Sequence, residues 1–189
     1  MNTLRVYIDF KSPAAYLAFK PTLALAERKD LTLDWQPIRT RQQPVPAEAA
    51  DEDRGTTHRR VRAQARRDTH LFYAQVQGVP MRFHTGAFPD TDLALACLGA
   101  LSNATQFIAT CFEAYWTLGA DLNHPETVAN ILQRCSDVHL DPANLNVEEI
   151  LHGKSEQAIA DQVIEAPGYV IAEQVFIGRE HLPWIEELL

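Results

Sequence analysis

Apolar and polar residues alternate at the start of the chain and again some twenty residues later. Residues 4–10 (LRVYIDF) alternate with the period of a half-buried β-strand, and residues 31–38 do so a second time. Between them, residues 13–29 carry apolar side chains at helical spacing. The pattern predicts a strand, a helix and a second strand, joined as a right-handed βαβ unit.

The middle of the chain reads as helical, and strands return near its end. A polar, proline-containing stretch at 39–55 predicts a surface loop. Beyond it the apolar spacing favours a run of helices, at residues 57–77, 90–101, 103–118, 125–135 and 147–163. Residues 168–172 and 174–177 then predict a short hairpin, and residues 181–189 a closing helix. Ala166–Pro167 directly precedes the hairpin and is a candidate cis peptide bond.

The start of the first helix carries candidate chemistry. Ser12 is a favourable N-cap, and Pro13 suits the first helical position because its missing N–H needs no partner there. Ala15 stands where a Glu or Gln would complete a capping box. We therefore expect the amides of the first turn to be open to an anion.

Composition narrows the class of protein. At 189 residues, the chain is long enough for one globular domain, or one domain with a large insertion. A formal net charge of −8 argues against non-specific binding to nucleic acid or to anionic membranes. No apolar run could span a bilayer, and the N-terminus has no signal-peptide pattern, so we expect a cytoplasmic protein.

The cysteines and histidines predict neither a redox pair nor a metal centre. Cys97, Cys111 and Cys135 lie far apart with no Cys-x-x-Cys spacing, and we expect them to be buried as small hydrophobic residues. The histidines follow no zinc-binding spacing, so no metal is expected.

A cluster of six arginines occupies residues 54–67. Arg59, Arg62 and Arg66 would share one helix face, which favours a solvated basic surface. Contact of one arginine with an acidic substrate and binding to nucleic acid stay open as alternatives, although no aromatic residues are interleaved as nucleic-acid binding would require.

Residues 9–18 (DFKSPAAYLA) resemble the signature D-F-x-S-P-x-S-Y-L-A of the 2-hydroxychromene-2-carboxylate isomerase and kappa-class glutathione transferase family, which has a DsbA-like thioredoxin fold. Further matches to that family follow in the same order along the chain, at residues 78–80, 88–89, 114–121 and 158–167. The resemblance implies an α/β thioredoxin-like fold (βαβ…ββα) with a large all-helical insertion. Residues 1–40 and 165–189 would form the thioredoxin-like domain and residues 56–164 the insertion. A homodimer is also implied.

The same resemblance implies a glutathione site. Ser12 would be the catalytic residue that stabilises the glutathione thiolate. The backbone at Ala166 and Pro167 would pair with the main chain of glutathione, while Arg179 and Glu180 would hold its charged end. The second substrate would be a small aromatic molecule, placed in a cleft between the insertion and the thioredoxin-like part.

The chain departs from the family pattern at several positions. Ala15 replaces a serine, Gly168 a threonine, Glu180 an aspartate and His181 an arginine, and residues 39–48 lack an asparagine found in many isomerases. These departures leave two hypotheses. The first is a glutathione-dependent isomerase or transferase acting on an aromatic-derived conjugated substrate. The second is a catalytically inactive thioredoxin-like binding or chaperone-like module, in which Ser12 only caps a helix.

Disulfide exchange is excluded by the residues themselves. Thiol–disulfide exchange needs a thiolate as the attacking group. Ser12 and Ala15 stand at the two positions where redox relatives carry cysteines. The chain is therefore not expected to be a disulfide oxidoreductase.

Overall fold

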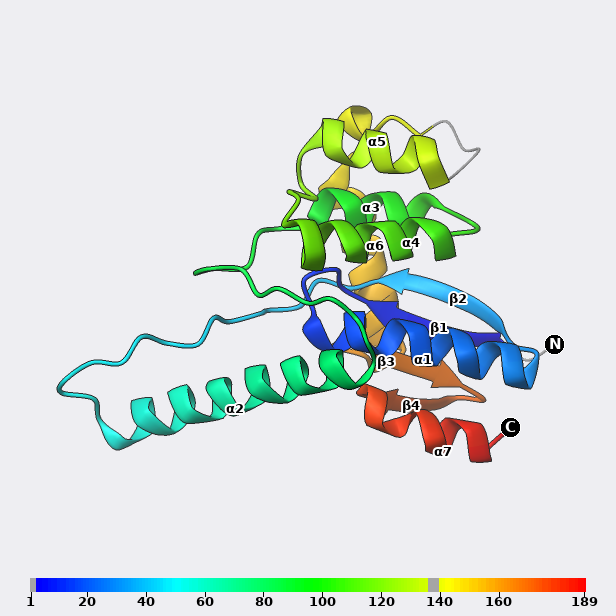
Figure 1. Ribbon diagram of the computed structural model, residues 1–189. Coiled ribbons are helices and arrows are strands. Elements are labelled where there is room, and N and C mark those ends of the chain that lie inside the picture. The colour runs from blue at the N-terminus through cyan, green and yellow to red at the C-terminus, as the bar shows by residue number, and fades with distance from the viewer. Residues whose placement is uncertain (1–2, 136–139) are drawn as a thin grey trace.

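A computed structural model describes residues 3–135 and 140–189 (Figure 1). Four strands form one sheet in the order β2-β1-β3-β4, with β1 and β2 parallel and the other neighbours antiparallel. The strands are β1 (Thr3–Ile8), β2 (Thr32–Pro37), β3 (Gly168–Ile171) and β4 (Gln174–Ile177). Helix α1 (Pro13–Lys29) joins the first two strands, and a 3₁₀ turn η3 (Arg179–His181) leads from β4 into α7 (Leu182–Glu187). The predicted thioredoxin-like βαβ…ββα plan is confirmed.

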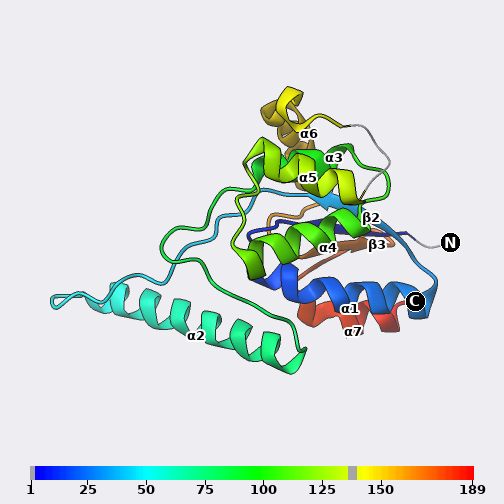
Figure 2. The ribbon, with the colours of Figure 1, turned by 45° about the horizontal axis from the view of Figure 1, so that its top comes forward.

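The segment between β2 and β3 is helical, as predicted. It contains α2 (Arg54–Val76), α3 (Asp92–Ala100), α4 (Thr105–Glu113), a π-helical turn η1 (Ala114–Leu118), α5 (Pro125–Cys135), a 3₁₀ turn η2 (Pro142–Asn144) and α6 (Val147–Ala160). Helices α3, α4 and α5 stack beside one another (Figures 1 and 2), while α6 packs against α3 and contacts β2.

Several predicted helix boundaries are wrong. The helix predicted over 57–77 begins earlier, at Arg54, and two other predicted helices end differently. The segment 103–118 is not one α-helix, because its last turn widens to a π-helix that Gly119 ends in a left-handed conformation. The helix predicted over 147–163 ends at Ala160. There Gln162 adopts a positive φ of 60°, and the N–H of Val163 turns back to the Ala158 carbonyl over 2.8 Å. Neither the π-helical turn nor the end of α6 changes the spacing of apolar residues, so neither could be predicted from it.

Strand β1 is buried on both faces, although its alternation predicts a half-buried strand. Tyr7 occupies one of the expected polar positions yet is fully buried. It packs in a small apolar cluster with Ala158 of α6 and with Val163, and its hydroxyl donates to Asp161 over 2.6 Å. Because α6 and the turn after it cover this face, only the tip of the tyrosine needs a polar partner.

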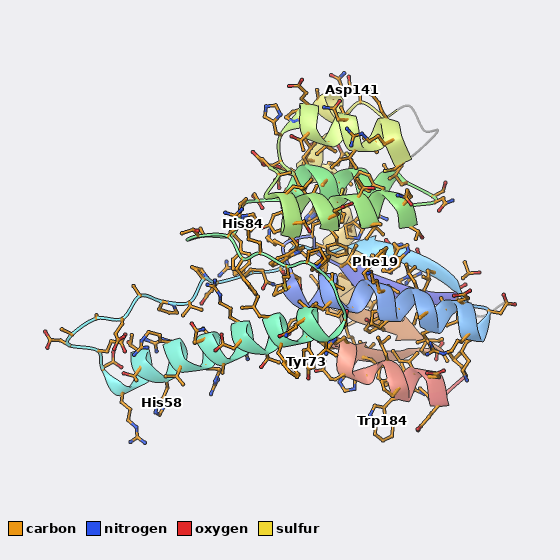
Figure 3. The ribbon with its side chains drawn as sticks, in the orientation of Figure 1. Phe19, His58, Tyr73, His84, Asp141 and Trp184 are labelled. Carbon is orange, nitrogen blue, oxygen red and sulfur yellow. The ribbon has the colours of Figure 1, made fainter. Side chains whose placement is uncertain are left out.

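Helix α2 and the loop before it project from the rest of the molecule (Figures 1 and 2). We call residues 54–76 the arm. The structure describes the arm throughout, and Ala74 is its one fully buried residue. The end of the arm that carries Tyr73 lies near the sheet, whereas His58 lies near the far end (Figure 3).

Cys97 and Cys111 are buried, as predicted, and Cys135 is half-buried. Burial raises the pKa of the Cys97 thiol to about 12, so this side chain is an inert apolar group. Among the described helices, none combines the length and the apolar character that crossing a membrane requires.

Candidate functional site

Ser12 begins α1 and is almost fully buried. Its Oγ accepts a hydrogen bond from the Ala15 N–H over 3.2 Å, which makes it the helix cap that the sequence predicts. Its hydroxyl donates to the carbonyl oxygen of Ala166, 2.8 Å away. The prediction of an open first turn is therefore wrong at Ala15, whose N–H the cap occupies. The single proton of the Ser12 hydroxyl is engaged as well.

The Ala166–Pro167 peptide bond is cis and lies against the start of α1. The N–H of Gly178 donates to the Pro167 carbonyl over 2.9 Å, so the turn after β4 sits beside this proline. Arg179 and Glu180 follow directly in that turn. The fold thus gathers the segments that carry all the predicted site residues at one end of the sheet.

Arg179 is held by a contact that the sequence did not suggest. Its guanidinium carbon lies 3.7 Å from the centroid of the Tyr73 ring, a close cation–π contact with the base of the arm. Glu180 is exposed, and its carboxylate bends back over the α-carbon of Gly178. In this state the Arg179 side chain is partnered and the Glu180 side chain faces solvent.

Asp9 organises the turn that precedes Ser12. Its buried carboxylate accepts hydrogen bonds from the backbone N–H groups of Lys11 (3.1 Å) and Thr40 (2.8 Å). The hydroxyls of Thr40 (2.8 Å) and Thr91 (3.1 Å) complete the set. Burial raises the pKa of Asp9, while Lys11 and the Thr40 bonds oppose the rise. This carboxylate ties the end of β1 to the loop after β2 and to the start of α3.

Aromatic rings form a wall one helical turn beyond Ser12. Tyr16 stacks on Trp116 with ring centroids 5.8 Å apart, and the Phe83 ring lies at 78° to the Trp116 ring with centroids 5.5 Å apart. The indole N–H of Trp116 donates to the Phe10 carbonyl over 2.9 Å, which fixes the wall to the turn beside Ser12. Trp116 is fully buried, so only Tyr16 and Phe83, which are half-buried, offer ring surface to a ligand.

Tyr115, Trp116 and the aromatic residues of α4 are buried in the core. At the end of the arm near the sheet, Phe72 is 61% exposed and Tyr73 37% exposed, and the Tyr73 ring contacts Arg179.

A cavity of about 230 Å³ opens beside the aromatic wall, and its lining residues are Arg82, Phe83, His84, Thr85, Tyr115, Leu118 and Gly119. All of them belong to the insertion, so this cavity is not the interdomain cleft that we expected for an aromatic substrate. His84 contributes a buried Nε2 without a hydrogen-bond partner. Burial and the nearby Arg82 lower the pKa of His84, so the imidazole is neutral near pH 7.

A larger cavity of about 500 Å³ is lined by Arg5, Gln36 and residues of α6. It contains none of the predicted site residues. Within residues 3–135 and 140–189, no group of three or more His, Cys, Asp or Glu side chains is arranged to hold a metal ion. The chemistry that the sequence predicts therefore rests on the end of the sheet around Ser12.

The family model for the DSBA-like thioredoxin domain matches residues 3–189. The chain belongs to the DSBA-like thioredoxin domain family. No curated protein sequence matches it. Among solved structures, a 2-hydroxychromene-2-carboxylate isomerase has a TM-score of 0.74 at 18% identity, over 98% of this chain and 93% of that one. The cytosolic disulfide reductase DsbM from Pseudomonas aeruginosa, solved with GSH, has a TM-score of 0.60 at 14% identity, over 98% of each chain. At these identities the likeness shows the fold.

Within the DSBA-like fold, the segments that carry the predicted site residues lie together, but the sequence did not predict the contacts that hold them. The role of Asp9 has one signal in the sequence, a carboxylate on a strand that is otherwise apolar at its end. The stacking of Arg179 on Tyr73 has none, because the two residues lie in elements far apart along the chain.

Proposed function

We propose that this DSBA-like protein is a glutathione-dependent isomerase or transferase that acts on an aromatic-derived conjugated substrate. The observation that carries the proposal is the 2.8 Å hydrogen bond between the Ser12 hydroxyl and the Ala166 carbonyl beside Pro167. At the start of α1, where redox relatives carry two cysteines, this chain has the hydroxyl of Ser12 and the methyl group of Ala15. The reacting sulfur must therefore come with a ligand.

Glutathione would lie along the end of the sheet. Its cysteinyl main chain would pair with the backbone at Ala166, where the Ser12 hydroxyl now donates. Its γ-glutamyl end would reach the turn after β4. There Arg179 is suited to a carboxylate and the exposed Glu180 to an ammonium group. Binding would require the Arg179 guanidinium to shift on the Tyr73 ring.

The role of Ser12 would be to stabilise the thiolate. A hydrogen bond from the hydroxyl to a charged sulfur is worth about 1.5–3 kcal/mol. Since about 1.4 kcal/mol corresponds to one pKa unit, this bond would lower the pKa of the bound thiol by roughly one to two units. The Ala166 carbonyl would then take its hydrogen bond from the ligand main chain.

The thiolate would add to the conjugated double bond of the substrate. Its electron pair forms the sulfur–carbon bond while the π pair moves onto the carbonyl oxygen and leaves an enolate. The former double bond is now single and can rotate. When the pair returns, the sulfur–carbon bond breaks and the thiolate leaves with the isomer formed. A transferase outcome requires only that a proton reaches the enolate before the thiolate leaves.

The aromatic wall supports an apolar acceptor. The half-buried rings of Tyr16 and Phe83 pack on the buried Trp116, which is hydrogen-bonded to the turn that carries Ser12. Rings of this kind favour offset or edge contacts with a bound aromatic molecule. The fold likeness to 2-hydroxychromene-2-carboxylate isomerase is in keeping with such a substrate.

A binding module without catalysis is the second candidate, and two contacts favour it. The Ser12 hydroxyl is already bonded to Ala166, and Arg179 is already stacked on Tyr73. A site whose polar groups are satisfied among themselves needs no ligand.

Calorimetric titration with glutathione separates the two candidates. The enzyme proposal predicts heat that saturates at millimolar ligand or below, and turnover of a hydroxychromene-type substrate that depends on glutathione. Ser12→Ala should lower that turnover by about tenfold or more. Ser102→Ala, at an exposed loop serine, is the matched control and should not. Absence of heat at millimolar glutathione would leave only the binding module.

A further inference from the structure

Arg179 is held by the face of an aromatic ring. Arg5, Arg28 and Arg39 each pair with carboxylates. In the part of the chain that the structure describes, Arg179 forms no such ion pair, and its guanidinium carbon lies 3.7 Å from the centroid of the Tyr73 ring. The charge of Arg179 is therefore left for an anion that arrives with a ligand.

A guanidinium held in this way keeps its hydrogen-bond donors accessible. At 3.7 Å from the ring centroid, the guanidinium carbon is at stacking distance, so the ring contacts the flat face of the group. The N–H groups lie in the plane of the guanidinium, and a carboxylate in that plane can accept two of them side by side. The guanidinium can also turn in its plane without leaving the ring. This geometry suits an arginine that binds a carboxylate.

Tyr73 is itself fixed by the end of the arm, residues 54–76. It lies at the end of the arm near the sheet (Figure 3). The Tyr73 carbonyl accepts the Gln77 N–H over 3.0 Å. The next residue, Ala74, is buried, and its carbonyl accepts the Val79 N–H over 2.9 Å. The position of this ring therefore determines where the Arg179 guanidinium lies.

We propose that Tyr73 is a positioning residue of the glutathione site, which holds Arg179 where it can bind the γ-glutamyl carboxylate of glutathione. Arg179 begins the turn whose Gly178 N–H donates to the Pro167 carbonyl over 2.9 Å, beside Ser12. The arm thereby contributes to a site that the sheet and the first helix otherwise form. This inference rests on the proposed function.

Calorimetric titration of glutathione into Tyr73 variants tests the inference. Tyr73→Leu removes the ring and should weaken glutathione binding by about three- to thirtyfold, the range expected for one cation–π contact. The conservative variant Tyr73→Phe keeps the ring face and should retain the affinity of the wild-type chain. Trp184→Leu, at an aromatic residue 63% exposed on α7, is the control and should also leave the affinity unchanged.

Arg179→Ala shows whether Tyr73 acts through Arg179. This variant should weaken glutathione binding at least as much as Tyr73→Leu does. Because the ring has no guanidinium left to hold, adding Tyr73→Leu to Arg179→Ala should weaken binding no further. Circular dichroism establishes that each variant is folded.

The outcomes separate this inference from the proposed function. Absence of glutathione binding by the wild-type chain would overturn both. If the wild-type chain binds glutathione and Tyr73→Leu binds it equally well, the role of Tyr73 alone is overturned. The same holds if Tyr73→Phe weakens binding as much as Tyr73→Leu, because the ring face is then not what matters. Full additivity of Tyr73→Leu and Arg179→Ala would also overturn it, because Tyr73 would then act independently of Arg179.

Discussion

The Ser12 hydroxyl donates to the Ala166 carbonyl over 2.8 Å and so joins the first helix to the residue before the cis-proline. A hydroxyl has one proton, and this bond uses it. When a thiolate binds, the Ser12 hydroxyl would have to donate its hydrogen bond to the sulfur, and another donor would have to bond to the Ala166 carbonyl. The exchange replaces a bond between neutral groups by one to a charged sulfur, which is the stronger kind. Under the proposed function this contact is the rest position of the Ser12 hydroxyl, whose oxygen also caps α1 by accepting the Ala15 N–H.

The family that this chain resembles has a threonine at the position of Gly168. Here Val163 fills the space that such a side chain would need. A Cβ at Gly168 would overlap the Cγ1 atom of Val163, which is itself buried. We expect Gly168→Ala to lower the free energy of unfolding by about 1–3 kcal/mol through overpacking. Urea denaturation measures the change.

The double variant Gly168→Ala, Val163→Ala checks the cause. Removing the two valine methyl groups makes room for the new Cβ, so the double variant should lose less stability than the sum of the two single variants. Strict additivity would mean that the two side chains do not compete for this space.

Asp9 cannot be replaced by its own amide. Each carboxylate oxygen accepts a backbone N–H, from Lys11 on one side and from Thr40 on the other. An asparagine must turn its NH₂ toward one of these donors, and neither backbone donor can become an acceptor. We expect Asp9→Asn to lower the free energy of unfolding by about 2–4 kcal/mol.

The control for Asp9 is Asp121→Asn. Asp121 is exposed and accepts the Asn123 N–H over 2.8 Å, a bond that the amide oxygen of asparagine can keep. Its effect should stay within about 0.5 kcal/mol. Equal effects at the two positions in urea denaturation would show that Asp9 does not hold the turn.

Tyr7 should contribute to stability in a way that depends on pH. Burial opposes ionisation of Asp161, but hydrogen bonds from Tyr7 and Arg5 outweigh it and lower the pKa of Asp161. A lowered native pKa stabilises the fold above the unfolded pKa, and this stabilisation is lost as the pH falls through the native value. Tyr7→Phe should therefore cost about 1.5–3 kcal/mol near pH 7 and less in acid, once the pH has fallen below the ordinary carboxyl pKa and Asp161 is protonated.

Tyr169→Phe provides the comparison for Tyr7. The Tyr169 hydroxyl is buried and pairs with the Thr22 hydroxyl at 3.1 Å, a bond between groups that stay neutral in acid. Its loss should cost the same free energy at both pH values. If Tyr7→Phe behaves likewise in urea unfolding at the two pH values, the charge on Asp161 has no part in the effect.

The strands, the first helix and the position of Ser12 could be predicted because each depends on the pattern of residues that are close together in the sequence. Alternation marks β1 and β2, and a cap followed by Pro13 marks the start of α1. The cis bond at Ala166–Pro167 followed from a proline placed directly before a strand. These features depend on neighbours in sequence, and a single sequence contains them.

The contacts that shape the site could not be predicted in this way. The Tyr73 ring under Arg179 and the Thr91 hydroxyl on Asp9 join elements that only the folded chain brings together. The exposure of Val61 and Phe72 on the arm could not be predicted either. Helical spacing shows that these two residues lie on a different face from Arg62 and Arg66, but not which face turns inward.

The pKa of the glutathione thiol in the complex tests the central claim most directly. Ultraviolet absorbance of the thiolate, followed over a pH titration, reports it for the wild-type protein, for Ser12→Ala and for Ser102→Ala. The wild-type protein and the control should hold that pKa roughly one to two units below that in Ser12→Ala, because only they retain the hydroxyl beside the sulfur. Equal thiol pKa values in all three proteins would contradict the claim and leave Ser12 as a helix cap.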